Sequence, residues 1–388
     1  MTPAHPIEPP IRRAVSRQPS PHDAVKELAD QLHHKDLSFV LFFCASSYDR
    51  DALASAMNAS FGDIAVCGCT SAGEITDQGY DQNTLVAIGF LRPAFAVSTE
   101  LIEDMQGFDL AAAQQLSETL RWSCQRDIKQ DGGHHEAFVF TLLDGLSIDE
   151  EVVIATLNTA LGSIPSFGGS AGESQRQDVT YVFHDGAFHT NAAVVIMMST
   201  ALEFQVFSHH HLHPSDKKLV ITDADPARRT VSELNGEAAA TVYARSLGKP
   251  LDTLNTISFA HYPLGVRIHD HCYPRSIQRL NEDLSLTFHC AVDTGVVLTT
   301  MSPEPMPAHL QGVLCDLEQQ LGDTWLILGC DCYLRRAEAE SLNQHEDCSA
   351  LFRQFGVTGF NTYGEQYRGM HLNQTFTGVA IGQRYRSR

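Results

Sequence analysis

The chain has 388 residues, enough for two or three domains at roughly 100 to 200 residues each. Apolar residues make up 43% and charged residues 19% of it, which excludes a disordered, collagen-like or disulfide-stapled protein. Acidic residues outnumber basic ones by 47 to 27, and the formal charge of −20 disfavours binding to nucleic acid or to a membrane surface. Because no apolar run reaches the roughly 20 residues that span a bilayer, and no apolar leader is present, we expect a cytoplasmic protein.

The first elements follow a proline-rich stretch. Residues 1–21 hold many prolines and little apolar content, which predicts a flexible arm. Apolar residues then recur at helical spacing from Val25 to Leu32, and the run 38–43 (SFVLFF) is typical of a buried strand. We therefore expect the folded part to begin with a helix that leads into a sheet.

An internal repeat organises the next part of the chain. Ser-Ala-Gly-Glu occurs at 71–74 and again at 170–173, each time after an apolar strand and before an Asn-led apolar strand. A weaker third copy covers 325–336 and 359–366 and closes from Asn373. Each unit indicates strand, helix, strand and a closing hairpin. The expected fold class is α/β with mixed α+β character, in which repeated strand-helix-strand units form mixed β-sheets flanked by helices.

A polar segment, residues 209–225, marks the expected junction between two domains. We place an N-terminal domain at 22–213, with internal repeats at about 22–108 and 109–213, and a C-terminal domain at 214–388. The second domain is expected to open with a helix from Val231 to Val242. Strands are expected at 257–262, 274–280, 284–291 and 296–301, and helices at 310–321 and 337–352.

Four separated motifs resemble the FIST sensory domain, with both its N-terminal and C-terminal parts. They are Cys67-Gly-Cys-Thr-Ser-Ala-Gly-Glu74, Leu234-Asn-Gly-Glu-Ala-Ala240, Gly359-Phe-Asn-Thr-Tyr-Gly-Glu365 and Asn373-Gln-Thr375. The resemblance implies a signal-input module that is not an enzyme. A histidine-rich chain with no output domain is similar to the nitric-oxide-sensing haemoproteins of the NosP group. That similarity implies haem b as cofactor, nitric oxide as ligand, and a histidine kinase or a diguanylate cyclase or phosphodiesterase as partner in trans.

Histidine is unusually frequent, with 19 residues, and two clusters are candidates for a haem ligand. A gas-sensing haem needs one neutral imidazole beside an apolar pocket. The alternatives are a solvated hinge or an adventitious metal patch for the first cluster, a surface turn for the second, and a satisfied core histidine for His261. The candidates are His209, His210, His211, His213, His261, His269 and His271.

The ten cysteines include two Cys-X-Cys pairs, Cys67/Cys69 and Cys330/Cys332. Four thiolates could hold zinc or an iron–sulfur cluster if the two pairs met in space, and a cysteine-based metal or redox switch is a further hypothesis. Buried, inert thiols are the alternative.

A haem-free sensor of an amino-acid-like metabolite is the main alternative function. Its pocket would use Tyr262, Arg275, Asn361, Tyr363 and Glu365, with Arg275 paired to a ligand carboxylate. Glu74, Glu173 and Glu365 end equivalent turns, where they either cap backbone amides or line a polar pocket. The segment Gly168–Gly172 matches a nucleophile elbow, but a strand follows it, so we interpret it as a turn. The sequence leaves a homo-oligomer open.

Overall fold

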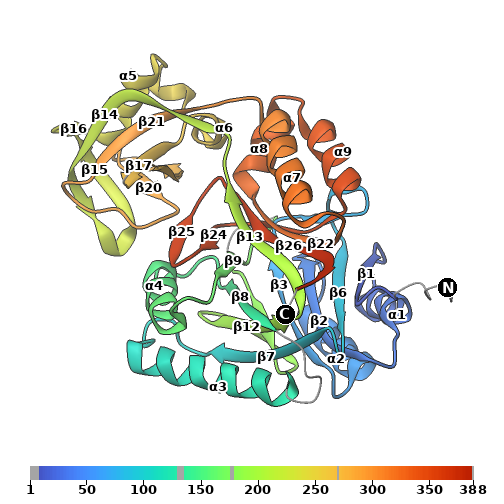
Figure 1. Ribbon diagram of the computed structural model, residues 1–388. Helices are drawn as coiled ribbons and strands as arrows, with labels where there is room; N and C mark the ends of the chain where they lie inside the picture. The colour runs from blue at the N-terminus through green and yellow to red at the C-terminus, as the bar shows by residue number, and fades with distance from the viewer. Residues whose placement is uncertain (1–7, 129–134, 175–178, 269–270, 387–388) are drawn as a thin grey trace.

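The computed structural model describes residues 8–128, 135–174, 179–268 and 271–386 (Figure 1). Within these residues, three six-stranded sheets share one strand order and a fourth sheet forms a separate lobe. The three sheets belong to three successive units of the chain. We call them sheets 1, 2 and 3, and together with their helices they form the body.

The strand order in each sheet of the body is edge strand, closing strand, two parallel strands and a hairpin. Sheet 1 contains β1 (Ile11–Ser16), β6 (Leu85–Leu91), β2 (Leu37–Ala45), β3 (Ala65–Ser71), β10 (Val182–His184) and β11 (Ala187–His189). Sheet 2 contains β7 (Phe95–Ile102), β12 (Ala193–Thr200), β8 (Glu136–Leu143), β9 (Ser166–Ser170), β24 (Glu365–Tyr367) and β25 (Met370–Leu372). Sheet 3 contains β13 (Leu202–His209), β26 (Phe376–Tyr385), β22 (Thr324–Cys332), β23 (Val357–Thr362), β4 (Glu74–Thr76) and β5 (Gly79–Asp81).

The last hairpin of every sheet comes from another unit. The first unit gives β4–β5 to sheet 3, the second gives β10–β11 to sheet 1, and the third gives β24–β25 to sheet 2. The exchange is cyclic, so each unit completes its neighbour. It also explains why the repeated Ser-Ala-Gly-Glu turn leaves its own sheet just after β3 and β9.

Helices cover the outer face of each sheet of the body. Each parallel strand pair needs a crossover, and α2, α4, or α8 with α9, supplies it. The helices are α1 (Pro21–Leu32), α2 (Arg50–Phe61), α3 (Leu110–Ile128), α4 (Glu150–Leu161), α7 (Met306–Leu321), α8 (Tyr333–Ser341) and α9 (His345–Phe355). Three separate apolar clusters join these helices to their sheets.

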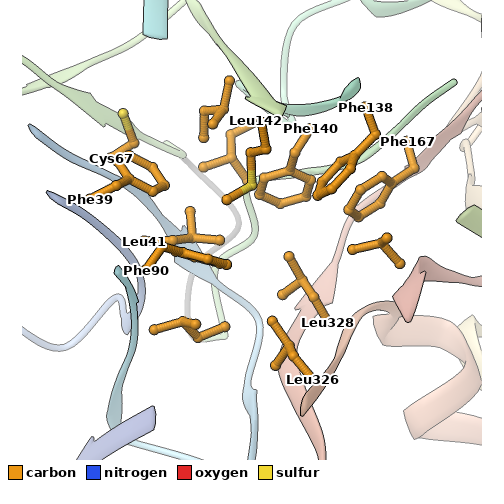
Figure 2. Close-up of a cluster of buried hydrophobic side chains, with 14 of the residues drawn as sticks. Phe39, Leu41, Cys67, Phe90, Phe138, Phe140, Leu142, Phe167, Leu326 and Leu328 are labelled. Atoms are coloured by element: carbon orange, nitrogen blue, oxygen red, sulfur yellow. The ribbon is translucent and has the colours of Figure 1, made fainter. Parts of the chain in front are cut away.

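The inner faces of the three sheets meet in one shared core (Figure 2). Phe39 and Leu41 come from β2, Phe138 and Phe140 from β8, and Leu328 from β22. Strands buried on both faces are expected to be continuously apolar, as residues 39–43 are. The shared core holds the three units around a common axis.

The fourth sheet is an insert between β13 and α7, formed by residues 212–303. Its elements are β14 (Leu212–Asp225), β15 (Thr230–Leu234), β16 (Glu237–Ala238), α5 (Ala239–Leu247), α6 (Thr256–His261), β17 (Leu264–Ile268), β18 (His271–Arg275), β19 (Ile277–Leu280), β20 (Leu286–Phe288) and β21 (Val297–Pro303), with two short 3₁₀ turns at Pro226–Arg228 and Leu251–Thr253. It has its own apolar core. In Figure 1 it forms the lobe at the upper left.

The structure confirms the mixed, helix-flanked sheets and the three repeated units, and it corrects several expected elements. Residues 11–16, expected in a flexible arm, form β1. The helix expected from Val231 to Val242 is wrong in its first half, where β15 and β16 precede α5, and residues 257–262 lie mainly in α6 instead of a strand. The domain boundaries stay predictions, but Pro214 lies inside β14, and residues after 303 return to the body.

Candidate functional site

Polar residues are buried between the insert and the body near the start of α4. Arg229 of the insert makes ion pairs with Glu150 (3.2 Å) and Glu151 (2.7 Å) of α4. Glu150 also accepts a hydrogen bond from Ser170, and Gln366 donates to the Ser170 hydroxyl at 2.9 Å. Residues from the second unit, the insert and the hairpin of the third unit therefore meet here.

His371 of β25 lies in this interface without a hydrogen bond to either ring nitrogen. It is 3% exposed, its Nδ1 lies 3.8 Å from Glu150 Oε1, and Arg275 Nη1 donates to its carbonyl at 3.2 Å. The ring packs against Gly364, where a β-carbon would lie 2.2 Å from Cε1. A hydrogen bond with the backbone of His289 acts to raise the pKa of His371 against the effect of burial, although neither ring nitrogen meets strict hydrogen-bond geometry.

Asn373 follows two residues later and is fully buried. Neither Nδ2 nor Oδ1 of its side-chain amide has a hydrogen-bond partner in the described part of the chain. A buried polar group left unsatisfied costs roughly 1–3 kcal/mol, so such groups call for a water, an ion or a ligand. Four unsatisfied polar atoms on His371 and Asn373 define the candidate site.

Burial sets the charge state of this site. Desolvation lowers the pKa of His371 to about 4 and that of His289 to about 3, so both rings are neutral at pH 7. Desolvation raises the pKa of Glu150 to about 8 against the opposing effect of Arg229. The pKa of Glu151 is lowered, because His371 and Arg229 outweigh its burial. Glu151 is therefore the ionised partner of Arg229.

The three copies of the closing hairpin show what is special about His371. Register places Tyr80 of β5, Phe188 of β11 and His371 of β25 at corresponding positions. The Tyr80 hydroxyl donates to Asp331 at 2.5 Å, and Phe188 packs among the rings of Phe42 and Phe183. Of these three corresponding side chains, His371 alone is polar and unsatisfied.

The histidine segment predicted to hold haem runs from the body into the insert. Nδ1 of His211 accepts a hydrogen bond from Arg335 at 2.8 Å, so Nε2 carries the proton and donates to Glu338 at 2.7 Å. His210 likewise uses both nitrogens, on the carbonyl of Cys272 and the amide of Leu212. Desolvation lowers the pKa of His211 to about 2 and that of His210 to about 4.

His209 differs from these neighbours. Its Nε2 is buried without a hydrogen-bond partner in the described residues, and its ring stacks on His309 with centroids 5.8 Å apart. Desolvation lowers its pKa to about 3, so the ring is neutral. His209 is therefore the member of the 209–213 cluster whose buried ring nitrogen has no hydrogen-bond partner among the described residues.

The remaining candidate histidines are dispersed. His213 is largely exposed, His261 shares a hydrogen bond with Ser341 at 2.7 Å, and His271 is an exposed residue of β18. His269 lies outside the described residues. Within the described ranges, no three His, Cys, Asp or Glu side chains are arranged to hold a metal ion.

The Cys-X-Cys pairs partly meet. Cys67, Cys69 and Cys330 belong to the shared core, whereas Cys332 packs with Ala260 and Leu334. Burial raises the pKa of all four thiols, so they stay protonated at neutral pH and are poor metal ligands in this conformation. Their binding of metal stays a prediction.

The predicted metabolite pocket is only partly assembled. Arg275 contacts His371, and the Tyr363 hydroxyl donates to the carbonyl of Glu173 at 2.6 Å. Tyr262 lies in the insert under Lys249, and Asn361 bonds with Asp331 and Arg336. Glu365 is buried as a cap, as the Discussion describes. The sequence reasoning missed His371, Glu150 and Arg229, although alignment of the three hairpins would have singled out His371.

Comparison with known proteins identifies the family. The FIST N domain matches residues 38–237 and the FIST C domain matches residues 239–368, so the chain belongs to the FIST family. FIST domains are sensory domains in signal transduction. The border between the two matches falls within the insert, between β16 and α5.

Other comparisons add little. No curated protein matches the chain. Two solved structures of T. maritima PurL, complexed with FGAR and with AMPPCP, align over 96% of this chain and 72% of theirs. Their identities are 10% and 9% and their TM-scores 0.20 and 0.19, which support no argument about fold or function. No helix among the described residues is long and apolar enough to cross a membrane.

Proposed function

We propose that this protein is a sensor that binds a small polar, amino-acid-like metabolite between the insert and the body. The observation that carries the proposal is the set of unsatisfied, fully buried polar atoms on His371 and Asn373. The site lies beyond the carboxyl end of β8, beside the start of α4. This is where ligands bind in sheets with parallel strands.

The chemistry around the site suits a ligand that carries both charges. A neutral imidazole and an amide offer donors and acceptors of hydrogen bonds. Arg275 supplies a cation for a carboxylate, and Glu150 and Glu151 supply oxygens for an ammonium group. An amino acid or a similar zwitterion meets these demands.

Binding here would act on the insert. Arg275 and Arg229 belong to the insert, whereas His371 and Glu150 belong to the body, so a ligand that contacts both sides favours one insert position. That position would be read by a partner. A histidine kinase or a diguanylate cyclase or phosphodiesterase in trans is the partner class that the NosP resemblance implies.

Asn373→Leu tests the proposal. Replacing a buried polar residue that serves a ligand should not lower the stability of the ligand-free protein, whereas replacing a polar residue that supports the fold should lower it. Leu has a similar size and removes two unsatisfied atoms, so the ligand-free variant should melt at the same temperature as wild type or higher. An amino-acid panel should raise the melting temperature of wild type and leave the variant unchanged.

The matched control is Asn361→Leu, because Asn361 is equally buried but hydrogen-bonded. This variant should lose about 1–3 kcal/mol of stability. The proposal fails if Asn373→Leu destabilises the protein as much as Asn361→Leu does, or if both variants respond to the panel as wild type does.

The environment of His209 favours a second candidate function, a sensor that binds nitric oxide through haem b. The fit of this chain to haem rests on the neutral ring of His209, whose Nε2 is buried and has no hydrogen-bond partner among the described residues. Haem bound there would supply the iron that binds nitric oxide. His209 would hold it, and because His209 ends β13, a change at its ring would act on the strand that enters the insert.

Absorption spectra of ferric and dithionite-reduced protein, before and after nitric oxide, test this candidate. His209→Leu should abolish stoichiometric uptake of haemin, while His213→Leu, at an exposed site on the same segment, should not. A colourless wild-type protein that takes up no haemin would exclude the candidate, as would full uptake by His209→Leu.

A further inference from the structure

A groove with a cavity volume of about 380 Å³ lies between the first and third units, away from the candidate site. Its size falls within the ordinary range of small-molecule pockets, roughly 300–1,000 Å³. The lining comes from β1, α1, the turn after β4, the end of α9 and the start of β23. It consists of Arg13, Val15, Arg17, Gln31, Thr76, Asp77, Phe352, Arg353, Gly356, Val357 and Thr358.

Three guanidinium groups line this groove, and each is held in place by a separate hydrogen bond. Arg13 donates to the carbonyl of Gly356 at 2.7 Å, and Arg353 donates to the carbonyl of Gln78 at 2.9 Å. Arg17 donates to the Thr76 hydroxyl at 3.3 Å. Side chains that hydrogen bonds already hold in place lose little further conformational entropy when an anion binds, so the groove is preorganised.

The charges of the groove are not balanced. Asp77 is the one carboxylate in the lining, and it pairs with Arg17, as does the neighbouring Asp81. Arg353 pairs with Glu346, whose side chain is 75% exposed. Among the described residues, Arg13 pairs with no carboxylate, and burial lowers its pKa because its charge is partly desolvated.

Strand alternation explains why Arg13 faces the groove. Arg13, Val15 and Arg17 lie on one side of β1 and its extension, while Arg12 points the other way and bonds to Glu8 and the carbonyl of His33. A neighbouring arginine with the opposite orientation is thus available as a control.

We propose that this groove binds a small dianion, either a dicarboxylate or a phosphate ester, through Arg13 and Arg353. Guanidinium groups bind both kinds of oxyanion with paired hydrogen bonds, and Thr358 and Gln31 add polar groups at the rim. Because the chain carries a net charge of −20, general attraction of anions does not explain such binding. A bound anion would connect β1 and the β4–β5 hairpin of the first unit with α9 of the third.

Calorimetry and thermal melts with succinate, malate and inorganic phosphate test the proposal, with sodium chloride at matched ionic strength as the reference. Wild type should bind at least one dianion and melt at a higher temperature with it. Arg13→Gln and Arg353→Gln should each weaken binding about tenfold or more, whereas Arg12→Gln should bind as wild type does.

The anions that bind identify the class of ligand. Binding of succinate and malate alone indicates a dicarboxylate, and binding of phosphate alone indicates a phosphate ester. The proposal is overturned if chloride gives the same stabilisation, or if circular dichroism shows both groove variants folded and binding unchanged. It is independent of the proposed function, because His371→Leu should keep the dianion response.

Discussion

At the scale of single residues, two buried glutamates act as matching caps in the first and third units. Glu74 accepts hydrogen bonds from Ser71 and from the hydroxyl (2.7 Å) and amide (3.2 Å) of Thr84. Glu365 repeats this with Thr362 and with the hydroxyl (2.8 Å) and amide (3.1 Å) of Thr375. The capping role expected from the repeated turn is confirmed for both.

The second unit departs from this pattern. Ala192 stands where the other units have Thr84 and Thr375, and Ser170 bonds to Glu150 instead. Glu173 is only partly buried and accepts a hydrogen bond from Ser46 at 3.0 Å. In the second unit, Ser170 therefore joins Glu150 at the candidate site instead of bonding to the glutamate of its own turn, as Ser71 and Thr362 do.

Glu365→Gln should reduce the loss of stability as the pH rises. Burial raises the pKa of Glu365 to about 8, so the folded state keeps a proton that the unfolded chain releases above its ordinary pKa near 4.5. Stability from this group is complete below pH 4.5 and is lost as the pH approaches 8. The neutral amide does not titrate, so the free energy of unfolding of the variant should fall less steeply with pH than that of wild type, by at most about 1.4 kcal/mol per pH unit.

Urea unfolding between pH 6.5 and 8.5 measures this effect. The buried histidines with lowered pKa values, His289 and His371, also titrate in the unfolded chain near pH 6.5, but they affect wild type and the variant equally and cancel in the comparison. Glu346→Gln, at an exposed position, is the control and should keep the wild-type slope. Equal slopes for Glu365→Gln and wild type would show that Glu365 is already ionised in the fold.

At the scale of elements, α8 connects the body to the insert at three polar points. The Tyr333 hydroxyl lies 3.0 Å from Nε2 of His289, and Ser341 lies 2.7 Å from Nε2 of His261. Glu338 holds His211, which lies on the segment that enters the insert. Movement of the insert relative to the body therefore has to break contacts with α8.

Tyr333→Phe should loosen the insert without unfolding the body. The change removes one hydrogen bond, worth about 1 kcal/mol, and leaves the ring in place. Hydrogen exchange around His289 and in α6 should become about five times faster, while exchange in β2 and β8 stays the same. Tyr385→Phe, at a half-exposed side chain, is the control. Uniform acceleration across the body would mean that Tyr333 supports the whole fold instead.

The sequence predicted elements where local patterns decide them and failed where distant segments do. Apolar periodicity correctly indicated α1 and β2. The repeated turns predicted a closing hairpin in each unit, but in the first unit the Asn-led strand β6 pairs with β1 and β2 instead of β3. The sequence pattern missed the short hairpin β4–β5 that lies between β3 and β6. It could not show that each hairpin joins another unit's sheet, because nothing local distinguishes an exchanged hairpin from one that folds back. The contact of His371 with Glu150 depends on that exchange, so the site could not be predicted.

At the scale of the whole molecule, the three units form a ring with corresponding joints. Strand β6 passes into β7 through residues 92–94, and β12 passes into β13 through Ala201. At the third joint, from β26 to β1, Pro10 and Tyr385 lie close to the first and last described residues and line one cavity with Pro93 and Ala201. Pro10 and Tyr385 thus lie at a joint that the other two units bridge covalently.

A circular permutant should therefore fold. It would start at Pro93, end at Arg92, and join Tyr385 to Pro10 through a short Gly-Ser linker, which moves the opening from one joint to the corresponding one. Each sheet keeps its edge strand and each hairpin its acceptor, so the far-ultraviolet dichroism should match wild type and the melting temperature should stay within about 5 °C. A second permutant, opened between Ala72 and Gly73, frees the β4–β5 hairpin from β3 and should be clearly less stable. If the first permutant is insoluble, or melts no higher than the second, then the covalent joint at 92–94 matters more than the ring of exchanged hairpins.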